Sequence, residues 1–137
     1  MTTEIATPAL ELADYLTAVA DHLRLHPHLH RVVVHTGQEN GELQLGSSPN
    51  EAEHLHEWFT SLENAHVVAC PWFDEGEHEH AYVAVHGHTK DGLKLRVWDK
   101  VHGLGKALGY EADSDGDQQP IDDSVLMDFA LAGEDAA

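Results

Sequence analysis

Residues 80–99 read HAYVAVHGHTKDGLKLRVWD, two apolar segments on either side of an Asp91-Gly92 turn. An Asp-Gly pair between alternating apolar segments is the strongest short-range signal of a β-hairpin. We therefore expect antiparallel strands at about residues 80–88 and 93–99. These strands need further strands beside them and helices over one face to bury their apolar side chains.

The sequence before this hairpin predicts two helices and three more strands. Residues 12–23 carry apolar side chains at steps of three and four, which is typical of an amphipathic helix. A second helix is expected from Ser48 to Leu62, with Ser48 and Glu51 in a capping box. The segments expected as strands are 31–36, 42–46 and 65–73. The order α-β-β-α-β-β-β predicts an α+β fold, an antiparallel sheet of about five strands with both main helices on one face.

Acidic residues far outnumber basic ones. The chain has 25 Asp and Glu against 7 Lys and Arg, a net charge of −18 with histidine neutral. Because a polyanion repels nucleic-acid phosphates and anionic lipids, we expect no direct contact with DNA, RNA or a membrane. Suitable partners are a basic surface, a cation, or a protein that normally holds DNA. The alternative is that the charge serves only solubility or adaptation to a salty cytoplasm.

Length and cysteine content bound the domain count and the compartment. The 137 residues fit one domain, and the opening MTTEIATPALEL has acids where a signal peptide has a basic region. Cys70 is the single cysteine, so it cannot form an internal disulfide. It stands in an apolar run, which predicts a buried, unreactive thiol. These features favour the cytoplasm.

The charge is divided unevenly along the chain. Residues 111–137 hold nine acids and no Lys, Arg or His, whereas all 13 histidines precede residue 103. This division predicts a domain over residues 1–110 and an acidic C-terminal segment over residues 111–137. Within that segment a short helix is expected at residues 122–131.

Two groups of residues have the composition of metal sites. His86 and His88 stand two apart in a predicted strand, so both rings point to one face, where they can bind Zn²⁺. A turn at Asp91-Gly92 would place both on the same face as Leu95 and Val97. The alternative is that these histidines are polar surface side chains and reflect composition only.

The second group approximates a calcium-binding loop. Residues 111–122 supply carboxylates at alternate positions and Gly116 at the sixth position. The acids that would bind Ca²⁺ are Glu111, Asp113, Asp115, Asp117 and Asp122. Glu at the first position and Asp at the twelfth depart from the usual loop. The alternative is a solvated acidic linker.

The segment that follows predicts a partner-binding helix. Val125, Leu126 and Phe129 fall on one helical face, with acids on the other. Acidic amphipathic helices dock into grooves on partner proteins. The residues expected at such a contact are Asp122, Asp123, Val125, Leu126, Asp128 and Phe129. The alternative is that this helix packs onto its own domain.

The N-terminal helix carries a resemblance. Residues 12–27, LADYLTAVADHLRLHP, resemble the opening of many small uncharacterised actinobacterial and actinophage acidic proteins. The resemblance implies a phage or mobile-element accessory protein and no particular activity. It carries over no functional residue.

These features favour binding over catalysis. The chain lacks Walker, GxGxxG, GxSxG, CxxC and HExxH motifs. We therefore expect a non-enzymatic acidic protein that acts through protein–protein contact, such as a decoy for a DNA-binding protein. One alternative is a protein that binds Ca²⁺ or Zn²⁺ through the residues named above. Another is a structural homo-oligomer, with Trp58, Trp72, Trp98 and Tyr82 leaving an exposed sheet face for a dimer.

Overall fold

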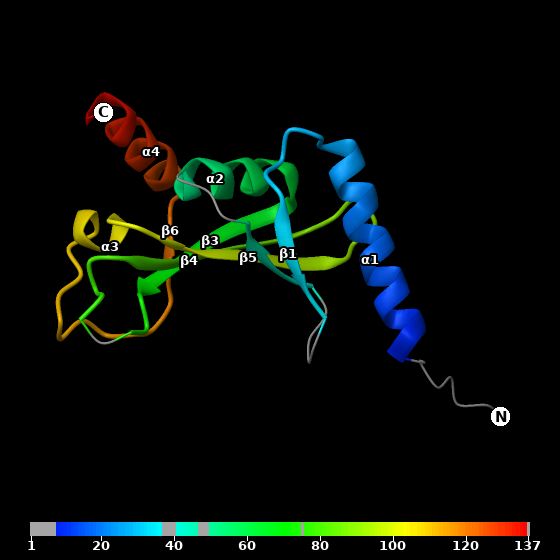
Figure 1. Cartoon of the computed structure of the whole chain (residues 1–137), viewed down its shortest axis with the longest axis horizontal. Coiled ribbons are helices and arrows are strands. Elements are labelled where there is room, and N and C mark those ends of the chain that lie inside the picture. Colours follow the sequence, from blue (N-terminus) through cyan, green and yellow to red (C-terminus); the bar gives the residue numbers. More distant parts are fainter. Residues whose placement is uncertain (1–7, 37–40, 47–49, 75, 137) are drawn as a thin grey trace.

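The computed structural model describes residues 8–36, 41–46, 50–74 and 76–136, and confirms the α+β fold (Figure 1). In chain order the elements are α1 (Pro8–Leu25), β1 (Val32–His35), β2 (Glu42–Leu45), α2 (Glu51–Ser61), β3 (Glu63–Pro71), β4 (Ala81–His88), β5 (Lys94–Val101), α3 (Leu104–Ala107), β6 (Gln119–Ile121) and α4 (Ser124–Ala136). Figure 1 shows α2 and α4 on the same side of the sheet, with α1 across one end of it.

The strands of the described chain form one six-stranded sheet in the order β1-β2-β5-β4-β3-β6. Every neighbouring pair is antiparallel except β2 and β5, which run parallel. The parallel pair arises because the chain crosses over through α2 before the second hairpin completes the sheet. The sixth strand, β6, comes from the acidic segment and is only three residues long, too short to show alternation in the sequence.

The turn between β4 and β5 is longer than Asp91-Gly92 alone would make it. The Thr89 N–H donates to the Leu93 carbonyl (2.9 Å), so the turn extends from Thr89 to Leu93. The resulting register places His86 opposite Arg96. A shift of one residue turns every side chain to the other face. The prediction that the His-x-His pair shares a face with Leu95 and Val97 is therefore wrong.

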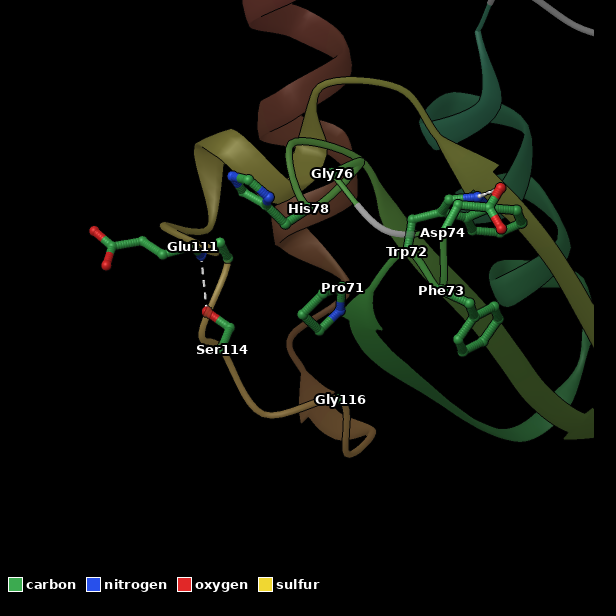
Figure 2. Close-up of a pocket in the computed structure, with 10 residues that line it drawn as sticks. Pro71, Trp72, Phe73, Asp74, Gly76, His78, Glu111, Ser114 and Gly116 are labelled. Carbon is green, nitrogen blue, oxygen red and sulfur yellow. Dashed lines mark hydrogen bonds between the residues drawn. The ribbon is translucent and has the colours of Figure 1, made fainter.

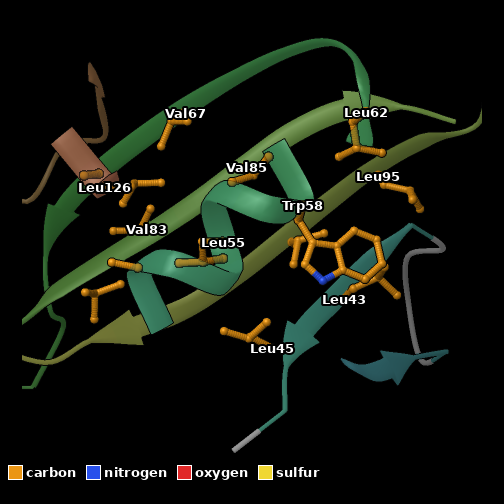
Figure 3. Packing of buried hydrophobic residues seen from close by; sticks show 14 of the residues in the cluster. Leu43, Leu45, Leu55, Trp58, Leu62, Val67, Val83, Val85, Leu95 and Leu126 are labelled. Atoms are coloured by element: carbon orange, nitrogen blue, oxygen red, sulfur yellow. The ribbon is translucent and has the colours of Figure 1, made fainter. Parts of the chain in front are cut away.

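The core lies between the sheet and α2. One row of cross-strand partners runs through all six strands on this side and is aliphatic throughout: Val34, Leu43, Val97, Val85, Val67 and Ile121. Leu55 and Trp58 of α2 are fully buried against the sheet, as Figure 3 shows. Burial of such side chains contributes roughly 1.5–3 kcal/mol each.

Helix α1 is held by two polar anchors. The Tyr15 hydroxyl donates to the Glu42 carbonyl (3.1 Å). The His22 ring stacks on Trp58 (centroids 5.5 Å apart), and its Nε2 lies 2.9 Å from the Ser61 hydroxyl. Because that hydroxyl donates to the Trp58 carbonyl (2.7 Å), the hydrogen between His22 and Ser61 belongs to His22. The contact is a structural anchor and not a nucleophile with its base.

The acidic C-terminal segment joins the fold. β6 pairs with β3, and α4 occupies the position where a helix is expected at residues 122–131. Leu126 of α4 is fully buried in the same core cluster as α2. The change in composition at residue 110 therefore falls inside one folded unit.

We expect the buried His22 to make the protein acid-sensitive. Burial, aided by neighbouring His26, lowers the pKa of His22 to about 4. The stability contributed by the neutral ring is therefore present above about pH 6.5 and is lost as the pH falls towards 4. Between about pH 7.5 and 4.5 this loss amounts to roughly 2.5 kcal/mol.

Urea denaturation of the wild type and His22→Gln at both pH values measures this contribution. Glutamine keeps an N–H donor for Ser61 but does not titrate, so the variant should lose less stability on acidification. His28→Gln replaces an exposed histidine and serves as the control. Equal losses in the wild type and His22→Gln would contradict the assignment.

We also expect Leu126→Ala to destabilise the whole domain. Truncating a fully buried leucine leaves a cavity, at a cost of about 2–4 kcal/mol in the free energy of unfolding. Leu131→Ala, on the same helix but 52% exposed, should cost less than about 0.5 kcal/mol. Urea denaturation compares the two variants, and similar small effects would show that α4 does not share the core.

Candidate functional site

The His-x-His pair lies on the side of the sheet away from α2. His86 stacks on His66 of β3, with ring centroids 4.9 Å apart and planes 6° apart. Burial lowers the pKa of His86, and nearby His66, Arg96 and Lys94 lower it further. Two cationic side chains next to the pair disfavour a divalent ion there.

The acidic loop offers carboxylates that point outward. Glu111, Asp113, Asp115 and Asp117 are all exposed. Asp122 is exposed too and accepts a bond from the Ser124 N–H (2.9 Å). Among the residues that the structure describes, no group of three or more His, Cys, Asp or Glu side chains is placed to hold a metal ion. A calcium or zinc site therefore stays a prediction.

A shallow pocket of about 380 Å³ lies where this loop passes the end of β3 (Figure 2). Its lining consists of Pro71, Trp72, Phe73, Asp74, Gly76, His78, Glu111, Ala112, Ser114 and Gly116. Asp74 accepts a bond from the Trp72 indole (3.2 Å), and Figure 2 shows Glu111 directed away from the other lining residues. The lining carboxylates therefore do not converge on a common point, as acid–base catalysis would need.

Helix α4 uses much of its apolar side within the domain. Leu126 is fully buried, and Val125 and Phe129 are partly buried against the core. Asp123 accepts a bond from His56 of α2 (3.0 Å). Of the residues expected to meet a partner, Asp122 and Asp128 are the exposed ones.

A polar cluster that the sequence did not indicate lies where α2 begins and β5 ends. Ser48 lies outside the described residues, and Glu51 accepts bonds from the His102 backbone N–H (3.0 Å) and from its Nδ1 (2.9 Å). The His80 ring lies 5.0 Å from the His102 ring and accepts a bond from the Gly103 N–H (2.9 Å). These side chains come from separate elements, so no spacing in the sequence brings them together.

Asp99 completes this cluster from the core side of β5. Burial raises the pKa of Asp99 to about 6, and the negative charge of Glu51 adds to the effect. Two carboxyl groups side by side, one of them with a raised pKa, are the arrangement of many acid–base sites. The signal for Asp99 was in the sequence, because it stands in alternation with Leu95 and Val97, on the buried side of its strand.

The side of the sheet away from α2, which we call the open face, has no helix over it among the described elements (Figure 1). One row of cross-strand partners crosses it from edge to edge: Val33, Gln44, Trp98, Ala84, Val68 and Pro120. Beside it runs a second row of charged and imidazole side chains: His35, Glu42, Arg96, His86 and His66. The open face is therefore part apolar and part titratable.

Five rings form a continuous chain of contacts over the open face. In order they are His35, Trp98, Tyr82, Phe73 and Trp72, with successive centroids 6.2, 5.8, 5.2 and 5.4 Å apart. Trp72 and Trp98 thus lie where an exposed sheet face was expected. The inclusion of Trp58 was wrong, because α2 directs that ring into the core on the other side.

Comparison with known proteins supplies no assignment. No protein family, no curated protein and no solved structure matches this chain. None of the helices in the described ranges combines the length and the apolar character needed to cross a bilayer. The function is therefore argued from the acidic segment and the open face.

Replacing Asp99 by Asn should stabilise the protein near neutral pH. Because the folded protein disfavours the ionised carboxylate, its stability falls as the pH rises from about 4 to 6. Asp99→Asn removes this loss and should raise the free energy of unfolding by about 1–2 kcal/mol near pH 7.5. The gain should shrink to a few tenths near pH 4, as urea denaturation can measure. Asp113→Asn, at an exposed position, is the control; a gain independent of pH would contradict the assignment.

Proposed function

We propose that this chain is a cytoplasmic, non-enzymatic binding protein that acts by contact with a basic protein. The observation that carries the proposal is that the acidic segment is part of the folded domain while six of its carboxylates are exposed. The exposed acids are Glu111, Asp113, Asp115, Asp117, Asp122 and Asp128. A folded acidic surface supports binding better than a free tail does, because less conformational entropy is lost on association.

Contacts within the acidic segment and at its downstream end hold its backbone in place. Downstream, β6 pairs with β3 and Leu126 lies in the core. Within the loop, the Asp117 N–H donates to the Asp115 carboxylate (3.0 Å). Hydrogen bonds from Ser124 hold the pKa of Asp122 below its usual range, so this acid stays ionised. The segment thus presents exposed carboxylates on a backbone that the fold holds in place.

The net charge selects the class of partner. A net charge of −18 attracts basic surfaces over long range and speeds their encounter. A protein that binds DNA phosphates carries such a surface, which supports an acidic decoy for a DNA-binding protein. The resemblance of residues 12–27 to actinophage proteins fits an accessory factor that acts on a host protein.

Neutralising the acidic loop should reduce partner recovery about tenfold. The triple variant Asp113→Asn, Asp115→Asn, Asp117→Asn removes three exposed charges and leaves amide oxygens for the local bonds. We expect immobilised wild type to retain a basic protein from host lysate, and the variant to retain about tenfold less. Added duplex DNA should displace the retained protein, because both compete for the same basic surface.

A matched control removes the same charge elsewhere. Glu11→Gln, Asp14→Asn and Asp21→Asn neutralise three exposed acids of α1, and this variant should retain the partner as the wild type does. If both triple variants lost retention of the partner equally, the interaction would depend only on net charge. Unchanged retention by the loop variant would rule out the acidic segment as the contact.

A further inference from the structure

We propose that the open face of the sheet is a self-association surface, on which two copies of the chain pack face to face about a two-fold axis. Self-association is a function beyond the binding of a basic protein. Its contact surface is the side of the sheet opposite α2 and α4. The occupant is a second copy of the chain.

The open face has the composition of an interface. Its first row is apolar on every strand except β2, where Gln44 stands, and Val33 in that row is 52% exposed. Phe73, in the chain of rings beside it, is 65% exposed. Aromatic and arginine side chains are enriched at interface cores, and Trp72, Trp98 and Arg96 supply them here. Apolar area of this kind on a soluble domain marks a contact site.

The charge of the open face differs from that of the rest of the chain. Of the chain's 7 Lys and Arg, four lie on this face by strand alternation: Arg31, Lys94, Arg96 and Lys100. Arg96 pairs with Glu42 (2.8 Å), and Lys100 pairs with Glu77 (2.9 Å). Glu63 lies opposite His88 on the same face, so three carboxylates offset the four cations and the local charge is close to balance within a chain of net charge −18.

The near-balance of charge on the open face favours a second copy of the chain as the partner. Two copies repel one another through their net charge, and the repulsion is weakest where cations offset the acids. Because three carboxylates offset its cations, two of them in direct pairs with Arg96 and Lys100, the face does not need an acidic protein to neutralise it. A second open face has the same near-balance of charge and satisfies both conditions.

The sheet geometry allows a closed dimer. Two sheets pack face to face about 10 Å apart with their strands nearly aligned. A two-fold axis parallel to the strands places β5 of one copy over β4 of the other and β1 over β6, so the apolar rows cover each other. The contact is isologous and stops at two copies. Helices α2 and α4 then lie on the outer sides of the dimer.

Sedimentation velocity of the full chain at tens of micromolar tests the proposal. We expect a dimer whose dissociation constant falls as salt is raised, because salt screens the repulsion between two acidic bodies and leaves the apolar contact intact. Binding of a basic protein has the opposite salt dependence, so the two proposals fail separately. A wild-type monomer in both low and high salt would overturn the self-association surface.

Two pairs of variants locate the contact. Val33→Glu and Phe73→Glu place a charge on the open face and should each raise the dissociation constant at least about tenfold. Leu131→Glu and Leu10→Glu make the same change on α4 and α1, at positions with matching exposed fractions of 52% and 65%, and should stay dimeric. Circular dichroism checks the fold, and the two open-face variants lie on different segments, so one suffices if the other misfolds. Dimers in every folded open-face variant, or monomers in the control variants, would overturn the proposal.

Discussion

The packing of α2 against the sheet is the constraint on which the rest of the structure depends. Trp58 lies at the centre of this contact. The ring is fully buried, stacks against His22 of α1, and donates its indole N–H to the His30 carbonyl (3.2 Å) in the connection to β1. One side chain therefore fixes α2, α1 and the segment between α1 and the first strand. Leu126 of α4 joins the same core, so the acidic segment is held by this arrangement as well.

Because α2 and α4 both lie on one side of the sheet, the two faces of the sheet have different chemistry. The row Val34 to Ile121 on the helix side is aliphatic, since it must exclude water. The neighbouring row on the open face alternates with it along every strand and contains Gln44, Trp98 and Pro120. The polar groups Glu51, His22 and Asp99 on the helix side each have a hydrogen-bond partner. One-sided packing thus creates both the core and the open face.

The sequence predicts the fold class and the main elements, because long alternating and periodic segments carry those signals. It fails where one residue decides the outcome: an added turn residue at Thr89–Leu93 reverses the face of His86. It also misses β6, whose three residues include a proline, and the contact between Glu51 and His102, which are 51 residues apart. Tertiary packing decides these features, and nothing local in the chain encodes them.

The acidic loop borders the open face, because Glu111 and Ser114 line one pocket with Trp72 and Phe73, whereas α4 lies on the other side of the sheet. In a dimer joined through the open faces, each copy keeps α4 and its exposed Asp128 on the outside. Two linked acidic surfaces bind a partner with repeated basic sites more tightly than one, because the second contact is intramolecular. Most DNA-binding proteins that read paired half-sites are themselves two-fold dimers. A two-fold acidic dimer would match that symmetry, which gives the open face a part in the same function as the acidic segment.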